Sequence, residues 1–172
     1  ESDDIYYSQH PVYNWIEINE IGTELLLTDY ANEQDEAEAI LLPFEFVYFD
    51  SSFNQVTICS NGWIGFGDQS TVANFRNYPI PTSIGPFAMI APFWDDLRVR
   101  QSGDPLEGVF YYYDEPNHRF IIEWYDLYPV EETELSETFQ VVLYDQAFSE
   151  SDNGDILFQY QEIINNNICP QW

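Results

Sequence analysis

The sequence contains no lysine, and its only basic side chains are four arginines against 31 aspartate and glutamate residues. Without lysine there can be no isopeptide cross-link, no Schiff-base catalysis and no phosphate-loop lysine within this chain. The formal net charge of -27 repels nucleic acid and anionic membrane surfaces. We therefore expect neither as a partner. The same charge opposes folding by self-repulsion unless cations gather on the protein.

Other features are also missing. No run approaches the roughly 18 apolar residues that a membrane helix needs, and no signal peptide is present. The acidic start, residues 1–4, is typical of a mature protein after cleavage. No Asn-x-Ser/Thr acceptor occurs. The two histidines and two cysteines do not have the spacing of a zinc site.

The composition nevertheless predicts a folded core. Hydrophobic residues make up 45% of the chain and aromatic residues 18%, which excludes a disordered acidic tail. A length of 172 residues suits one domain and does not require a second.

Apolar residues recur with a period of two, and turn signals separate short segments. This pattern predicts an all-β fold, an antiparallel β-sandwich of about ten strands in a single domain. Asn61-Gly62 is the strongest hairpin signal, and Pro43 marks a sheet edge or a bulge. Residues 68–86 read as a long crossover anchored by Phe75 and Tyr78. The expected strands are residues 13–18, 24–28, 40–48, 55–60, 63–66, 87–93, 109–113, 120–125, 138–144 and 155–161.

Alternation along the last three strands assigns their faces. The inward set is Phe120, Ile122, Trp124, Phe139, Val141, Leu143, Ile156, Phe158 and Tyr160. The opposite face is unusually apolar, with Tyr125, Val142 and Tyr144 among its members. Either the terminal segments of the same chain cover this face, or a neighbouring subunit covers it.

Seven ordered motifs resemble the nidogen-type extracellular domain and its bacterial secreted relatives. They are LPFEFVYF, VTICSNGWIGFG, IAPFWDDL, GVFYYYD, RFIIEW, ETFQVVLYD and DILFQYQEI, between residues 40 and 163. The resemblance implies a non-catalytic β module located outside the cell or at the cell surface. On this interpretation residues 1–39 are an N-terminal extension with the first strands, residues 40–163 the core, and residues 164–172 a tail.

An extracellular location favours pairing of the two cysteines. Cys59 shares a strand face with Gln55 and Thr57, away from Val56 and Ile58. We predict a Cys59–Cys169 disulfide that holds the C-terminal tail. An intermolecular bridge and two unpaired thiols remain as alternatives.

Acidic loops are candidate calcium sites, since calcium prefers carboxylate and carbonyl oxygens. Asp95 and Asp96 form one candidate, Asp152 and Asp155 a second, and a third lies within residues 29–35. The alternative for each is an ordinary solvated turn. We predict Ca²⁺ as a structural ion.

Catalysis has little support. Glu123 or the Asp95/Asp96 pair would have to act as acid and base, or His118 would have to work with a serine. His118 lies in a turn, and His10 lies outside the recognised motifs. Sugar binding is a better competitor, since an exposed Trp63 or the tyrosines of residues 111–113 could stack on sugar rings.

The sequence therefore predicts a non-catalytic structural subunit that self-assembles into a surface filament or sheath. Residues 5–15, including Ile5, Tyr6, Tyr7 and Val12, could add as a donor strand to a neighbour's sheet. The simpler alternative is that they belong to their own domain. A further alternative function is an adhesion or carbohydrate-binding module of a larger secreted protein, with an extracellular protein or glycan as partner.

Overall fold

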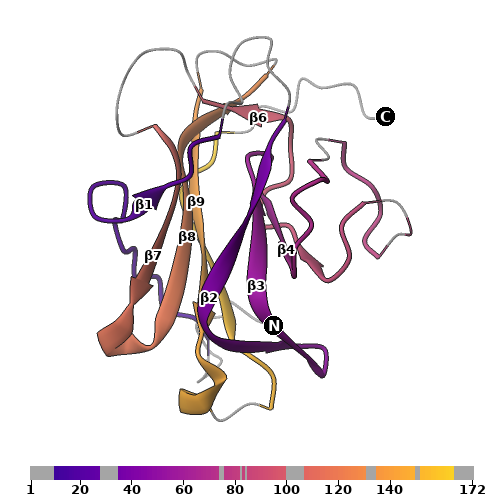
Figure 1. The fold of residues 1–172 in the computed structure, drawn as a ribbon. Helices are drawn as coiled ribbons and strands as arrows, with labels where there is room; N and C mark the ends of the chain where they lie inside the picture. The colour runs from indigo at the N-terminus through magenta and orange to yellow at the C-terminus, as the bar shows by residue number, and fades with distance from the viewer. Residues whose placement is uncertain are drawn as a thin grey trace.

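The computed structural model describes residues 10–27, 35–73, 76–81, 83, 85–99, 107–130, 135–149 and 152–164. Within these ranges ten strands form two antiparallel sheets that face each other, and no α-helix occurs (Figure 1). The prediction of an all-β sandwich in one domain is confirmed. In the described part of the chain, no helix is long and apolar enough to span a membrane.

The larger sheet has the strand order β1-β7-β8-β9-β10, with β6 paired to the far end of β8. Its strands are β1 (Thr23–Glu24), β6 (Leu97–Arg98), β7 (Gly108–Asp114), β8 (Arg119–Pro129), β9 (Glu137–Tyr144) and β10 (Ile156–Glu162). Short 3-10 turns, η1 (Glu115–Asn117) and η2 (Gln146–Phe148), follow β7 and β9.

The smaller sheet has the order β2-β3-β4-β5. Its strands are β2 (Ala37–Tyr48), β3 (Ser51–Cys59), β4 (Trp63–Phe66) and β5 (Met89–Ile90). β2 lies at the edge, and its pairing with β3 shifts register between Leu41 and Phe46. Pro43 falls within that shift, where the missing N–H costs no ladder hydrogen bond. The prediction for Pro43 is confirmed.

The predicted hairpin between β3 and β4 is present. Gly62 has φ 73° and donates its N–H to the carbonyl of Cys59. Positive φ is accessible to glycine without strain, which explains its place in the turn. Asn61 adds a second function, because its Oδ1 accepts from the Leu97 N–H at 3.0 Å. The turn thus also fixes the start of β6.

The main core lies between the two sheets. The predicted inward residues of β8 and β9 are all buried there: Phe120, Ile122, Trp124, Phe139, Val141 and Leu143. Phe46, Ile58 and Phe66 meet them from the smaller sheet. Burying each of these large side chains contributes about 1.5–3 kcal/mol to stability. Alternation therefore predicts this interface correctly.

The outer face of the larger sheet is covered by residues 10–18 of the same chain. Ile18 is fully buried there with Phe110, Ile121 and Val142. Residues 13–18 do not form the expected strand, because their backbone bonds go to side chains of the sheet. Asn14 N–H donates to Gln159 at 2.7 Å, and Ile18 N–H donates to Glu123 at 3.2 Å. The apolar outer face is therefore covered by a terminal segment of the same chain, which is the first of the two predicted alternatives.

The outer face of the smaller sheet is covered by the crossover between β4 and β5. Tyr78 packs on Trp94, with ring centroids 6.3 Å apart, which agrees with its predicted anchoring role. Phe75 lies outside the described residues. Cys59 is fully buried beneath this crossover with Trp63 and Met89. The expectation that Cys59 faces a polar environment is therefore wrong, since aromatic residues far away in sequence cover it.

Candidate interaction groove

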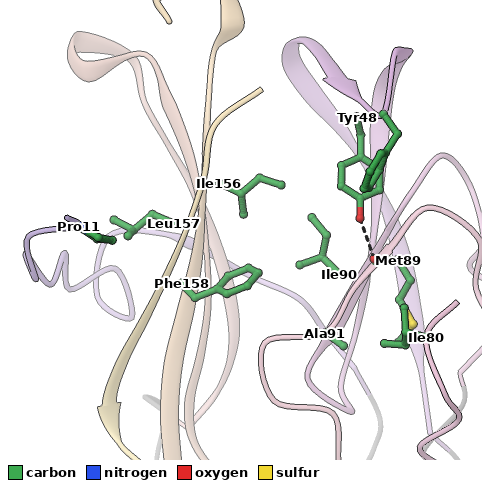
Figure 2. A pocket seen from close by; sticks show the side chains of 10 residues that line it. Pro11, Tyr48, Ile80, Met89, Ile90, Ala91, Ile156, Leu157 and Phe158 are labelled. Atoms are coloured by element: carbon green, nitrogen blue, oxygen red, sulfur yellow. Dashed lines mark hydrogen bonds between the residues drawn. The ribbon is translucent and has the colours of Figure 1, made fainter. Parts of the chain in front are cut away.

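An apolar groove of about 690 Å³ lies where the two sheets separate at one side of the sandwich (Figure 2). β10 of the larger sheet forms one wall, and β5 with its neighbours forms the other. The lining consists of Pro11, Tyr48, Phe49, Ile80, Met89, Ile90, Ala91, Ile156, Leu157 and Phe158. None of these side chains is charged.

Both walls are sheet edges. Among the described strands, β10 pairs only with β9, and β5 pairs only with β4. An edge strand presents backbone N–H and C=O groups that another strand can join. The groove therefore combines apolar side chains with a backbone edge along β10.

The alternation of β10 explains the apolar wall. Ile156 and Phe158 point from β10 toward Ile90 across the gap, whereas Leu157 points to the other side of the sheet (Figure 2). Ile156 packs against the main core. Phe158 remains 42% exposed because the smaller sheet ends at β5, so nothing covers its ring fully. Phe158 therefore faces inward from β10 and is still partly exposed, because it lies at the edge of the sandwich.

Two tyrosine hydroxyls donate to backbone carbonyls at the groove. Tyr160 donates to the carbonyl of Pro92 at 2.9 Å and joins β10 to the segment after β5. Tyr48 donates to the carbonyl of Met89 at 3.2 Å on the other wall. Burial raises the pKa of both phenols. Both hydroxyls therefore stay protonated donors at neutral pH.

Carboxylates stand at both ends of β10, the strand that forms one wall of the groove. At the Tyr48 end, Asp50, Asp152 and Asp155 are all exposed. The Asp50 N–H donates to Asn153 Oδ1 at 3.1 Å, and this bond brings the β2–β3 turn against the loop before β10. At the Tyr160 end, Glu162 is the last residue of β10.

Glu137 lies close to that second end. Burial raises the pKa of the Glu137 carboxyl, and the nearby negative charges of Asp95 and Glu162 raise it further. The Ile164 N–H donates to Glu137 Oε2 at 2.9 Å, and this hydrogen bond lowers the pKa of Glu137. This end of the groove therefore carries mutually repelling carboxylates.

The predicted calcium ligands are not brought together. The carbonyl of Asp96 accepts from Val130, just beyond the Pro129 end of β8. The carbonyl of Asp155 accepts from Tyr144, which pairs with Arg119 at the opposite end of β8. Eleven residues of strand correspond to about 35 Å. Among the described residues, no group of three or more His, Cys, Asp or Glu side chains could hold a metal ion. Asp29 and Asn32 of the third candidate lie outside those residues.

Glu123 is buried under the N-terminal segment and does not line a cleft. Its pKa is raised to about 9 by burial first and then by the neighbouring Glu17 carboxylate. Glu123 Oε2 accepts from the Ile18 N–H at 3.2 Å and from Gln140 Nε2 at 3.4 Å. These contacts assign Glu123 to holding residues 10–18 on the sheet.

Several other catalytic and sugar-binding candidates make contacts within the fold. His118 has φ 51° and stacks on Phe148, with ring centroids 3.5 Å apart. The His10 ring bonds to the adjacent carbonyl of Pro11 at 3.0 Å. Trp63 is fully buried, so the idea that it stacks on a sugar is wrong. Tyr111 stacks on Phe120.

The predicted assembly residues divide into four groups. Val142 is fully buried under Ile18 of its own chain, so its prediction as a contact with a neighbour is wrong. Tyr125 and Tyr144 are half-buried around the same cluster. Val12 is 71% exposed. Ile5, Tyr6 and Tyr7 lie outside the described residues, as does Cys169.

The pattern of apolar residues does not predict the groove. The alternation assigns Phe158 to the core, and nothing in the pattern marks Ile80 or Met89 as groove residues. The usable signal is the position of residues 155–161 as the last predicted strand, because a terminal strand often lies at a sheet edge. The wall opposite β10 contains β5, and the position of β5 depends on the path of the long crossover, which the pattern does not predict.

Comparison with known proteins gives one match. A family model described as NIDO related matches residues 7–168. The match includes the N-terminal segment that the resemblance in residues 40–163 leaves out. No curated protein and no solved structure matches the chain.

Proposed function

This chain belongs to the NIDO-related family, a typically extracellular and non-enzymatic type of domain, and we propose that it is a structural module that binds an extended segment of another chain. The segment would lie in the groove and add to the edge of β10. Binding of this kind takes affinity from backbone hydrogen bonds and specificity from pockets for alternate side chains.

The groove between two sheet edges is the observation that supports this proposal. Its lining is apolar, and Phe158 and Ile80 keep 42% and 55% of their surface exposed on opposite walls. Exposed apolar patches of this kind are typical of interaction sites. Among the catalytic candidates, Glu123 is fully buried and His118 stacks on Phe148.

Self-assembly into a filament or sheath is the version of this function in which a second copy occupies the groove. The donor segment is then the first part of the predicted donor strand, residues 5–9, because residues 10–18 cover the outer face of their own sheet. A chain that lacks residues 1–9 keeps Pro11 in the groove, so it should keep its fold and lose the ability to assemble. In the adhesion version, the segment belongs to a different extracellular protein.

Selection from a displayed library of random peptides tests the general function. We expect clones that bind the wild-type domain and fail to bind Phe158→Asp or Ile80→Asp, because a charge in the apolar groove opposes desolvation. Leu26→Asp is the matched control, since Leu26 is 81% exposed and does not line the groove. Thermal unfolding establishes that each variant is folded.

The same variants test self-assembly in sedimentation velocity runs with and without calcium. Oligomers that disappear in Phe158→Asp and persist in Leu26→Asp support a second copy as the occupant. If the wild-type domain sediments as a monomer and no selected clone distinguishes the variants, the proposed function is refuted.

A further inference from the structure

We infer that the segment that fits this groove has apolar side chains in alternation and a basic residue near each end, and that a second copy of this chain does not supply it. The inference rests on the proposed function and specifies its partner. It follows from the distribution of charge along β10.

The middle of the groove selects apolar side chains. No charged side chain lines it, and Phe158 and Ile156 face Ile90 across the gap. A charged residue of the partner at this depth would lose its hydration without gaining an opposite charge. The central residues of the segment must therefore be apolar wherever they point inward.

The two ends select positive charge. Asp155 directly precedes β10 and Glu162 is its last residue, so carboxylates bracket the strand. The extended chain between them spans about 25 Å. A partner strand paired along β10 would place its own ends beside these carboxylates.

Further acidic groups reinforce each end. Asp50 lies close to the loop that carries Asp152 and Asp155, because Asn153 Oδ1 accepts the Asp50 N–H. The Asp155 carboxylate accepts from the Ser149 hydroxyl. Near Glu162, the carboxylates of Asp95 and Glu137 interact unfavourably with one another. Arginine or lysine at the ends of a partner segment would relieve this repulsion.

None of the arginines that the structure describes lines the groove. Arg119 pairs with Asp114 at 2.7 Å on the β7–β8 hairpin. Arg98 lies over the Tyr128 ring, 4.9 Å from its centroid. Arg76 belongs to the crossover between β4 and β5. The positive charge that the groove ends select would therefore come from the partner.

A second copy does not meet the requirement. The chain has no lysine, and its arginines stand at positions 76, 98, 100 and 119. No two of them flank an apolar run of about the length of β10. A second copy also carries the same net charge of -27, which opposes association. A segment with basic ends from a different chain is attracted instead.

The test uses three synthetic peptides of the same length, each with alternating valine and threonine between the two end residues. The ends are arginine in the first, the neutral isostere citrulline in the second and glutamate in the third. We expect the arginine peptide to bind the wild-type domain about tenfold more tightly than the citrulline peptide at low salt, and this ratio to fall at high salt. Isothermal titration calorimetry measures each affinity.

Charge variants locate the effect. A variant with four neutralised carboxylates at the groove ends should bind the arginine and citrulline peptides with similar affinity. Its changes are Asp50→Asn, Asp152→Asn, Asp155→Asn and Glu162→Gln. A control with equal loss of charge should keep the tenfold ratio. Its changes, all at exposed positions elsewhere, are Glu20→Gln, Glu24→Gln, Glu38→Gln and Glu115→Gln.

The outcomes separate the two proposals. Equal binding of all three peptides, lost in Phe158→Asp, overturns the inference about charge and leaves the proposed function standing. Self-association that depends on Phe158, without binding of any peptide, overturns the inference in favour of a second copy. If the domain binds no peptide and does not self-associate, both the inference and the proposed function are overturned.

Discussion

Glu123 and Gln140 lie directly opposite each other on β8 and β9, and Gln140 Nε2 donates to Glu123 Oε2 at 3.4 Å. Gln159 on β10 continues the row, since its Nε2 donates to Gln140 Oε1 at 2.8 Å. Together these three side chains form a polar ladder across the outer face of the sheet. The ladder bonds the backbone of Asn14, Ile16 and Ile18 and so fixes the N-terminal segment.

Replacing Glu123 with glutamine should remove a pH-dependent term from the stability of the domain. The pKa of Glu123 is about 9 in the folded protein against an ordinary value of 4.5. The stabilising effect of the neutral acid is therefore complete below about pH 4.5 and is lost as the pH rises toward 9. Glutamine mimics the neutral acid at every pH. We expect the free energy of unfolding to fall more steeply with pH in the wild type than in Glu123→Gln. The difference between the two slopes should be at most about 1.4 kcal/mol per pH unit.

Urea unfolding across this pH range provides the measurement. Glu115→Gln removes one exposed carboxylate outside the ladder and controls for the change in net charge. Glu17→Gln should reduce the total loss of stability over this pH range, because the Glu17 carboxylate contributes to the raised pKa of Glu123. Parallel pH profiles for the wild type and Glu123→Gln would show that Glu123 is charged in the folded state.

Replacing Gln159 with alanine should release the N-terminal segment. Gln159 is buried, accepts from the Asn14 N–H and donates to the Asn14 carbonyl at 3.0 Å. Alanine removes both bonds to Asn14 and leaves the buried Gln140 Oε1 without its donor, which costs about 1–3 kcal/mol. We expect faster hydrogen exchange at Asn14 and Ile18. Gln161→Ala is the control, since Gln161 follows on the same strand but is exposed; equal exchange in both variants would contradict the role of the ladder.

Replacing Gly62 with alanine should strongly destabilise the fold. Gly62 has φ 73°, and a Cβ there would overlap the carbonyl oxygen of Phe93. We expect a loss of about 3 kcal/mol or more in the free energy of unfolding. Gly67 is a matched control because its φ is also positive, 87°, but the nearest neighbour of an added Cβ would be 3.6 Å away. Chemical denaturation should give Gly67→Ala a loss of only about 1 kcal/mol, and similar losses at both sites would show that the close approach to Phe93 is not rigid.

The period of two predicts most of the sandwich because it reports local backbone geometry. The strands β7 to β10 and the inward residues such as Trp124 follow from it, and the Asn61-Gly62 turn signal adds the β3–β4 hairpin. The same pattern does not reveal β6, because two residues, Leu97 and Arg98, are too few to show a period. Residues 13–18 alternate like a strand, yet they lie across a sheet face and bond to the side chains of the polar ladder.

The groove is harder to predict because it depends on contacts between distant segments. Ile80 and Met89 reach it through the crossover, and Phe158 is exposed only because β5 ends the opposite sheet. The environment of Cys59 escapes prediction for a related reason. Its polar neighbours Gln55 and Thr57 suggest a solvated face, but Tyr78 of the crossover and Trp94, which follows β5, pack in the cluster that buries Cys59.

The predicted Cys59–Cys169 disulfide remains open to a direct experiment. Cys59 is fully buried, and Cys169 lies outside the described residues. We expect that neither cysteine is alkylated when the purified protein is denatured without reductant and analysed by mass spectrometry. Reduction should then lower the free energy of unfolding by up to about 4–5 kcal/mol. Alkylation of both cysteines without reductant would rule the bond out.

Calcium should raise the thermal stability of this domain by more than the increase that ionic strength alone produces. Carboxylates gather at the groove ends, and the whole chain carries a net charge of -27 that opposes the compact state. Any salt screens this repulsion, so a specific ion must be distinguished from screening. We expect millimolar calcium to raise the melting temperature more than sodium chloride of equal ionic strength, and EGTA to reverse the gain.

Two double variants locate the calcium ion, because their sites lie at opposite ends of β8. One combines Asp95→Asn with Asp96→Asn, and the other combines Asp152→Asn with Asp155→Asn. Both lose the same amount of negative charge, so each serves as the control for the other. Loss of the calcium effect in one variant alone would place the ion at that pair, whereas equal stabilisation of the wild type by calcium and sodium chloride would reduce the effect to general screening.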